Sequence, residues 1–190
     1  MLETSQLILA SGSRARYSLL KSAGVAFTVI PADIDETAVR ETLTSDNPEI
    51  DPVDVADVLA RVKGEAVSAA NPDSLVIAAD QVLALGPEIF SKPADLEDAR
   101  ECLKNLRGRT HQLHSAVVLA ENGEVTWAHV ETADMTMRNF STTFLSEYLV
   151  KAGEAVCHSV GGYQLEGQGI QLFEKIDGDY FTILGLPLLP

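Results

Sequence analysis

The stretch that most constrains the fold lies near the N-terminus, at residues 7–24. Residues 7–10 are apolar and bounded by polar residues, as in a buried strand. Ser-Gly-Ser at 11–13 interrupts this run, and leucines then return at helical spacing. Gly24 follows them, and glycine readily adopts the left-handed backbone conformation that often ends a helix. We therefore predict a strand, a short turn and a helix, with Ser13 as the N-cap.

Positive charge at the start of this helix has two interpretations, an anion site or a solvated surface. Arg14 and Arg16 fall in the first turn, where the helix dipole disfavours each cation by about 0.3–1 kcal/mol. A bound anion would remove that cost, because it would meet free N–H groups, hydroxyls and a guanidinium together. The alternative is that both arginines are solvated on an ordinary surface helix, and the stretch alone does not decide between the two.

The composition limits the classes of protein to consider. A length of 190 residues with 46% hydrophobic residues fits one domain, or one domain with a sizeable second lobe, with a real core, and we predict a single domain over 1–190. The formal net charge of −14 argues against binding to nucleic acids or membrane surfaces, which need a cationic face. A small phosphorylated ligand remains compatible with this net charge, provided that local cations or a divalent metal offset the negative charge of the carboxylates.

Cysteine usage and the absence of targeting signals indicate a cytoplasmic protein. Cys102 and Cys157 stand outside any CxxC motif, which favours reduced thiols over a disulfide framework. The N-terminus lacks a secretory signal, and no apolar run reaches membrane-spanning length. The chain stops at Pro190 on an apolar run, where we would expect a further helix.

Two further segments carry charge that has either a structural or a chemical role. The acidic run at 32–36 follows a predicted strand at 27–30, and it is either a solvated loop or a site for a hard metal ion such as Mg²⁺. Residues 37–51 are polar and predict a loop, and an amphipathic helix follows at 52–70. Lys63 lies beside the apolar stripe of this helix, so that it either reaches into a cleft or extends to solvent.

Asp80 interrupts an otherwise apolar strand over residues 75–85. An ionised carboxylate there is costly unless a cation or metal pairs with it. A turn at Gly86-Pro87 should bring Lys92 back antiparallel towards Asp80. Asp80 and Lys92 are therefore either a structural ion pair or part of a site, and the position of Asp80 directly after the apolar run at 75–79, taken as a strand end, favours the site.

The remainder of the chain alternates strands and helices. Asn122-Gly123 is a strong hairpin signal, and His111 and His114 should point to opposite faces of a strand, which disfavours a metal pair and leaves them as ordinary strand or surface residues. The predicted elements are a helix at 96–106 with Asp95 as its cap, strands at 110–121 and 125–138, a helix from Ser141 to Lys151, a glycine-rich segment at 161–169, and a hairpin of 170–176 with 180–184.

Several short motifs occur in order along the chain. They are Ala10-Ser-Gly-Ser with Arg16 and Leu19-Leu20, Asp33-Ile-Asp-Glu36, Ala79-Asp80-Gln81, Ser91-Lys92-Pro93, Leu106-Arg-Gly-Arg-Thr-His111, Gly161-Gly-Tyr with Glu166-Gly, and Gly178-Asp with Gly185-Leu-Pro187. Together they resemble the Maf family of nucleoside triphosphate pyrophosphatases, over essentially the whole chain. The resemblance implies an α/β fold, with an elongated mixed sheet flanked by helices and a cleft between two lobes, as in the inosine triphosphate pyrophosphatase group.

The same resemblance implies hydrolysis of a nucleoside triphosphate to its monophosphate and pyrophosphate, dependent on Mg²⁺ or Mn²⁺, by a homodimer. Asp80 matches the catalytic aspartate that activates water, and Glu36 an acidic residue that helps Asp80 to hold the metal. The polar and cationic contacts of the triphosphate match Ser11, Ser13, Arg16, Lys63 and Lys92. This is chemically coherent, because hydrolysis at the α-phosphate depends on charge neutralisation and positioning of water.

Two departures from the family pattern bear on activity and substrate. Ala15 stands where the family often has an arginine, and only Arg16 of that pair is retained. Gln81 and Glu166 resemble the branch that acts on 7-methyl-GTP more than the branch that acts on dTTP and UTP. The Glu166 carboxylate would accept hydrogen bonds from guanine N1–H and N2–H, unless it is simply a solvated loop residue.

From the sequence alone, two other functions remain as alternatives. A nucleotide-binding regulator of cell division or growth would use the same residues without hydrolysis, but it gains little from Asp80 beside a triphosphate. An acidic interaction domain would leave the placement of Arg16, Lys63 and Lys92 unexplained. We therefore expect an enzyme whose partner is its nucleotide substrate, with no nucleic acid and no membrane involved.

Overall fold

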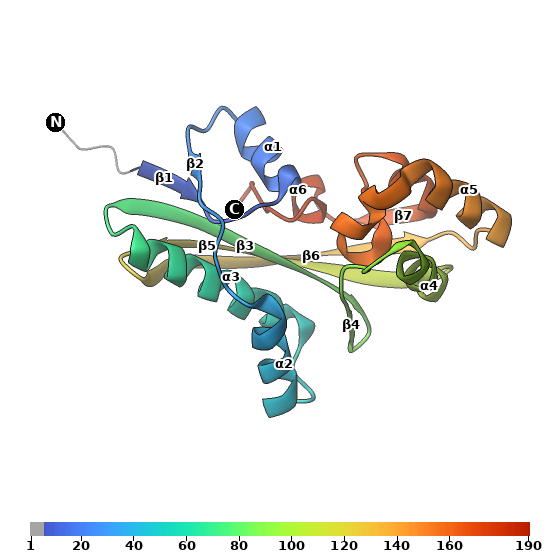
Figure 1. Ribbon diagram of the computed structural model, residues 1–190, viewed down its shortest axis with the longest axis horizontal. Coiled ribbons are helices and arrows are strands. Elements are labelled where there is room, and N and C mark those ends of the chain that lie inside the picture. The colour runs from blue at the N-terminus through green and yellow to red at the C-terminus, as the bar shows by residue number, and fades with distance from the viewer. Residues whose placement is uncertain (1–5) are drawn as a thin grey trace. The chain divides into compact units, whose positions relative to one another are not determined.

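The computed structural model describes residues 6–190, which form two compact units (Figure 1). Among the described residues, the first unit contains 6–81 together with His114–Glu131 and Tyr180–Pro190, and the second contains Val82–Leu113 and Thr132–Asp179. That the whole chain is one domain stays a prediction. No helix in this part of the chain is both long and apolar enough to cross a membrane.

Seven strands and six α-helices occur within the described residues. The strands are β1 (Gln6–Leu9), β2 (Thr28–Val29), β3 (Ser74–Leu85), β4 (Glu88–Phe90), β5 (Thr110–Glu121), β6 (Glu124–Met137) and β7 (Phe173–Asp177). The helices are α1 (Arg14–Ser22), α2 (Glu36–Asp46), α3 (Pro52–Ala70), α4 (Leu96–Leu106), α5 (Thr142–Ala152) and α6 (Tyr180–Ile183). Three short 3₁₀ segments, η1 (Gly153–His158), η2 (Val160–Gly162) and η3 (Gln168–Leu172), precede β7.

The sheet is mixed, as predicted for this α/β fold. Backbone hydrogen bonds join the strands in the order β2-β1-β3-β5-β6-β7, and β4 pairs with β3. β1 runs parallel to both β2 and β3, with Leu9 beside Ile77. The β3–β4 and β6–β7 pairs are antiparallel, so the predicted hairpin at 86–87 is confirmed.

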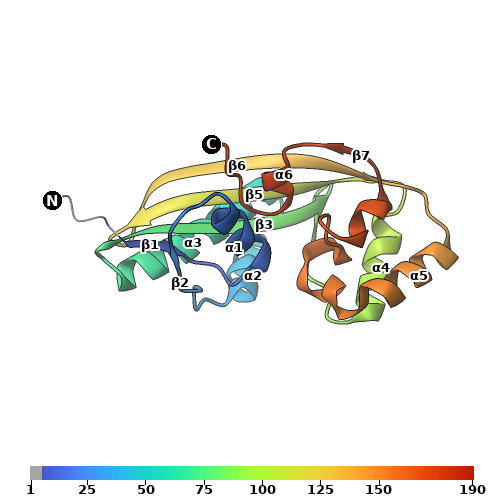
Figure 2. The same ribbon diagram turned by 90° about the horizontal axis from the view of Figure 1, so that it is seen from above.

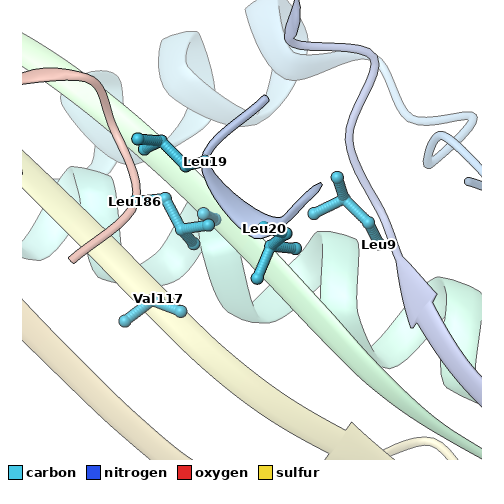
Figure 3. Close-up of a cluster of buried hydrophobic side chains, with 6 residues drawn as sticks. Leu9, Leu19, Leu20, Val117 and Leu186 are labelled. Carbon is cyan, nitrogen blue, oxygen red and sulfur yellow. The ribbon is translucent and has the colours of Figure 1, made fainter. Parts of the chain in front are cut away.

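In the first unit, α1 and α3 cover opposite faces of the sheet (Figure 1). Alternate residues of β3 point to opposite faces. Ala79 is buried in a cluster with Leu19 and Leu20 of α1 and with Leu186 near the C-terminus, and Figure 3 shows these leucines gathered above β3 and β5. Ala78 faces α3 instead. The chain after α6 therefore packs on the same face as α1.

In the second unit, α4 lies beside α5 and against the 3₁₀ segments (Figure 2). The side chain of His111 is fully buried there, and its Nε2 lies 2.7 Å from the hydroxyl of Tyr163. His114, in the first unit, is also buried. Both histidines lie on β5, so of the two expected alternatives, ordinary strand or surface residues, the structure supports strand residues, and a buried partner accommodates the polar ring of His111.

Local signals predicted most element ends correctly. Ser13 caps α1, since its side chain accepts a hydrogen bond from the Arg16 N–H, and Gly24 has a φ of +75°. Asn122 and Gly123 both have positive φ at the β5–β6 turn, as an Asn-Gly hairpin requires. The helix predicted at 52–70 coincides with α3. Both cysteines are free thiols, as expected.

Two segments differ from the prediction. Residues 37–51 were expected to be a loop, but α2 occupies most of that range, begun by a hydrogen bond from the Ala38 N–H to Asp35 Oδ1. None of its residues is buried, so its sequence lacks the apolar period that reveals a helix. The predicted hairpin of 170–176 with 180–184 is also wrong, because η3 and α6 occupy its two ends. The β-favouring residues of α6 are held helical by tertiary packing.

Candidate active site

The first unit contains a group of charged side chains on α3, β3 and α2, of which those on α3 and β3 are buried. The Lys63 ammonium lies 2.6 Å from Asp80 Oδ1 and 2.9 Å from Glu36 Oε1. The side chains of Lys63 and Asp80 are only 7% and 6% exposed, whereas that of Glu36 is 47% exposed. Lys63 is therefore not a solvated surface lysine. It joins a buried carboxylate to a second carboxylate that solvent and ligands can reach.

Close packing of α3 on the sheet brings Lys63 to Asp80. Gly64 follows Lys63, and a Cβ at this glycine would lie 2.9 Å from Val118 Cγ2 and 3.3 Å from Ala120 Cβ. Real Cβ atoms do not approach so closely, so only glycine allows α3 to pack at this distance from the sheet. This requirement could not be predicted from the sequence, because an isolated glycine within a helical pattern is usually only tolerated.

The Asp80 carboxylate has one oxygen engaged and one free. Oδ1 accepts a hydrogen bond from Lys63, whereas Oδ2 is buried and has no hydrogen-bond partner among residues 6–190. A buried carboxylate oxygen normally has a partner, and an orphaned one indicates a place for a water molecule, a metal ion or a substrate group. Asp80 thus has a lone pair available beside a fixed cation.

Arg16 lies on α1 with its guanidinium oriented by two hydrogen bonds. Its Nε donates to the carbonyl oxygen of Gly185 at 2.7 Å, and Nη1 donates to Ser11 Oγ at 3.1 Å. Burial lowers the pKa of Arg16 from its ordinary 12.5, while the charges of Asp80 and Glu36 oppose that shift. Arg16 therefore shares its electrostatic environment with both carboxylates and stays charged. The Gly185 carbonyl is a partner that the sequence did not reveal.

The serines of the turn after β1 each keep a proton for donation. Ser11 Oγ accepts from the Ser13 N–H at 3.2 Å and from Arg16, and Ser13 Oγ accepts from the Arg16 N–H at 3.4 Å. Because these contacts use only the hydroxyl lone pairs, both O–H groups are available to an anion. The β1–β3 register places this turn level with the Ala79–Gln81 segment.

The donor set around Asp80 fits a hard divalent cation. Among the residues that the structure describes, no group of three or more His, Cys, Asp or Glu side chains is arranged as a metal site. Mg²⁺, however, is often held by one or two carboxylates together with substrate phosphates. Asp80 Oδ2, which has no partner among residues 6–190 and so two unused lone pairs, and the half-exposed carboxylate of Glu36 are the oxygens that would hold such an ion, with one Oδ2 lone pair left for a proton.

The structure therefore brings together six of the eight predicted residues, Ser11, Ser13, Arg16, Glu36, Lys63 and Asp80, in the first unit. Lys92 and Glu166 belong to the second unit, and both side chains are exposed. The ion pair that Asp80 forms in the first unit is with Lys63.

A buried carboxylate paired with a lysine, and an arginine that feels its charge and is held by a serine hydroxyl, are groups whose chemistry suits binding and hydrolysis of a phosphorylated substrate. The family model described as "Maf-like protein" matches residues 6–190, and this chain belongs to the Maf family.

Curated relatives resemble the chain over nearly its whole length. A protein named 7-methyl-GTP pyrophosphatase from Brucella abortus is 54% identical over 187 residues, covering 98% of this chain and 93% of the relative. A protein named nucleoside triphosphate pyrophosphatase from Paramagnetospirillum magneticum is 53% identical over 182 residues, covering 96% of this chain and 93% of the relative. Among solved structures, a HAM1 protein from Coxiella burnetii has a TM-score of 0.43 and 16% identity, covering 71% of this chain and 74% of that one.

Proposed function

We propose that this protein hydrolyses a nucleoside triphosphate to a nucleoside monophosphate and pyrophosphate, with Asp80 as the general base. The chain is a nucleoside triphosphate pyrophosphatase, a hydrolase acting on acid anhydrides, by its family and its relatives. The observation that supports the assignment of Asp80 is its buried Oδ2, which has no partner in residues 6–190 while Lys63 holds Oδ1.

In the reaction, Asp80 Oδ2 accepts a proton from a water molecule as that water attacks the α-phosphorus. The bond between the α-phosphorus and the oxygen bridging to the β-phosphate breaks, and pyrophosphate leaves with the electron pair. Lys63 fixes the Asp80 carboxylate, so that its free oxygen is held in one orientation. Arg16 and the hydroxyls of Ser11 and Ser13 donate to phosphate oxygens, which neutralises charge and aligns the chain of phosphates.

We propose Asp80 and Glu36 as the residues that hold Mg²⁺ or Mn²⁺. When bound, the metal supplies positive charge to the phosphate oxygens in the transition state. Glu36 is suited to this because its carboxylate is half-exposed, at the N-terminus of α2, and is already fixed by Lys63.

We further propose 7-methyl-GTP as the preferred substrate. This is supported by the names of relatives from Brucella and Mesorhizobium at 54% and 52% identity, both 7-methyl-GTP pyrophosphatases. In this proposal Glu166 accepts hydrogen bonds from the guanine edge, and Lys92 adds a cation for the phosphates. A cytoplasmic location, a homodimeric state and the absence of nucleic-acid binding also remain predictions.

The test of the reaction is pyrophosphate release by the purified protein, with Asp80→Asn as the variant. We expect turnover to fall by a factor of about 10² to 10⁴ in this variant, as for loss of a general base. Asp57→Asn is the matched control, because Asp57 also forms an ion pair, at 2.7 Å to Arg61 on the same unit, but lies outside the charged group. Wild-type turnover in Asp80→Asn would refute the role of Asp80.

Measurements with a panel of triphosphates, with and without Mg²⁺ or Mn²⁺, test the substrate and the metal. We expect 7-methyl-GTP to have a higher kcat/KM than dTTP or UTP, and Glu166→Ala to reduce that preference. Absence of hydrolysis for every triphosphate, with binding retained, would instead favour the nucleotide-binding regulator.

A further inference from the structure

The side chain of Gln81 joins β3 to the C-terminal helix α6. Its Nε2 lies 2.9 Å from Ser115 Oγ, 3.1 Å from the carbonyl oxygen of Thr182 and 3.0 Å from that of Ile183. The Ser115 hydroxyl in turn donates to the Thr182 carbonyl at 2.7 Å. Carbonyl oxygens only accept, so the nitrogen of the Gln81 amide, rather than its oxygen, faces them. Gln81 is therefore a donor to the last turn of α6.

The residue that ends this turn is also the residue that orients Arg16. The Gly185 N–H donates to the Thr182 carbonyl at 2.9 Å, which closes the turn, and Gly185 has a φ of +86°. Its own carbonyl accepts from Arg16 Nε at 2.7 Å. A Cβ at Gly185 would lie 3.3 Å from Arg16 Nη2 and 3.6 Å from Gln81 Cδ. Gly185 thus lies between the amide of Gln81 and the guanidinium of Arg16.

Arg16 uses only part of its hydrogen-bonding capacity for this orientation. The guanidinium has five N–H donors, of which one is used by Gly185 and one by Ser11. The remaining donors form a planar fork, and the direction in which it points is fixed by the Gly185 carbonyl. A shift of that carbonyl would rotate the fork.

We propose that Gln81 is a positioning residue for substrate binding: by holding α6 it sets the place of the Gly185 carbonyl and so aims Arg16 at the phosphates. This rests on the proposed function, in which Arg16 binds the triphosphate. Gln81 need not touch the substrate to act in this way, since its effect passes through two hydrogen bonds and one turn of backbone.

The geometry of β3 separates this role from that of its neighbour. Asp80 and Gln81 are consecutive in a strand, so their side chains point to opposite faces. Asp80 points to Lys63 on α3, and Gln81 to α6. Loss of the Gln81 amide therefore leaves the partners of the proposed base in place. The expected effect is on KM for the triphosphate and not on kcat.

The first test is steady-state kinetics of Gln81→Met, with the triphosphate that the wild-type protein hydrolyses best. Methionine preserves length and removes both donors. We expect KM to rise about tenfold and kcat to change less than threefold, as for loss of uniform binding. Gln112→Met is the matched control, because Gln112 also donates through Nε2, at 3.1 Å to Asp134, but in the second unit. We expect the control to keep the wild-type KM.

The second test asks whether Gln81 acts through Arg16. In an Arg16→Ala background, Gln81→Met should raise KM no further, because the group that it positions is absent. Gln81→Glu has the same size but lacks the amide donors, and it should raise KM at least as much as Gln81→Met. It replaces Gln81→Met in the test if the methionine variant does not fold. A wild-type KM in Gln81→Glu, or independent effects of the Gln81 and Arg16 substitutions, would overturn the inference.

The outcomes separate this inference from the proposed function. If the wild-type protein releases no pyrophosphate, or if Asp80→Asn keeps full turnover, the proposed function fails and the inference fails with it. If both behave as expected but Gln81→Met keeps the KM of the wild type, only the inference is overturned.

Discussion

Replacement of Lys63 by methionine should destabilise the protein by about 3–5 kcal/mol, the range for removal of one partner from a buried ion pair. The side chains of Lys63 and Asp80 are 7% and 6% exposed, and their charged atoms lie 2.6 Å apart. Methionine keeps most of the apolar volume of lysine, so the loss arises mainly from the Asp80 carboxylate, whose Oδ2 already lacks a partner in residues 6–190.

The two partners of this ion pair should respond unequally. Asp80→Asn leaves the Lys63 ammonium with a second carboxylate, Glu36, at 2.9 Å. We therefore expect Asp80→Asn to lower the free energy of unfolding by only about 1–2 kcal/mol, the scale of one hydrogen bond to a charged group. The double variant should lose less than the two single variants together, because no uncompensated charge stays buried.

The assay is urea unfolding of the four proteins at pH 7, followed by circular dichroism, with the free energy of unfolding taken from the midpoint and slope. Because the chain forms two units, the transition must first be shown to be two-state, by agreement of far-UV and fluorescence signals. A loss below 1 kcal/mol in Lys63→Met, or additive losses in the double variant, would refute the argument that Lys63 neutralises a buried Asp80 carboxylate.

Two further predictions concern other buried residues. Burial lowers the pKa of His111 from 6.5 to about 4, so below pH 6.5 the unfolded chain takes up a proton before the folded protein does. The free energy of unfolding should therefore fall by about 2 kcal/mol between pH 7 and pH 5. A His111→Gln variant should lack this loss when its free energy of unfolding is measured in urea. Gly64→Val should reduce both the melting temperature and pyrophosphate release, because its side chain would meet Val118 and Ala120 and push Lys63 away from Asp80; a variant with wild-type melting temperature and turnover would contradict this.

Most of the fold could be predicted from the sequence because its signals are local. The N-cap at Ser13, the Asn122-Gly123 turn and the apolar stripe of α3 each depend on a few neighbouring residues, and all three agree with the structure. The two wrong predictions of secondary structure, at α2 and α6, also have a physical cause. α2 buries none of its residues, and α6 is a four-residue helix whose sequence favours a strand. Neither helix therefore has the apolar repeat that would predict it.

The candidate site was predictable as a set of residues rather than as an arrangement. The motifs singled out Asp80, Lys63 and Arg16, but Lys92 was the expected partner of Asp80 across a hairpin. In the first unit that partner is Lys63, from a helix that precedes β3 in the chain. Pairing of side chains from separate elements depends on how closely a helix packs on the sheet, and here that distance is permitted by the absence of a side chain at Gly64.

The sequence by itself determined the family, the α/β class and the identity of the charged residues, because these follow from motif order, from apolar periodicity and from residue chemistry. Only the tertiary structure decided that, among residues 6–190, Asp80 has one engaged oxygen and one without a partner, and that Gln81 donates to α6 while Arg16 donates to the Gly185 carbonyl. Gln81 and α6 are far apart in the chain, and the hydrogen bonds between them exist only because α6 returns to the face of β3 opposite to Asp80. A sequence records which groups are present, whereas their hydrogen-bond partners depend on elements distant in the chain.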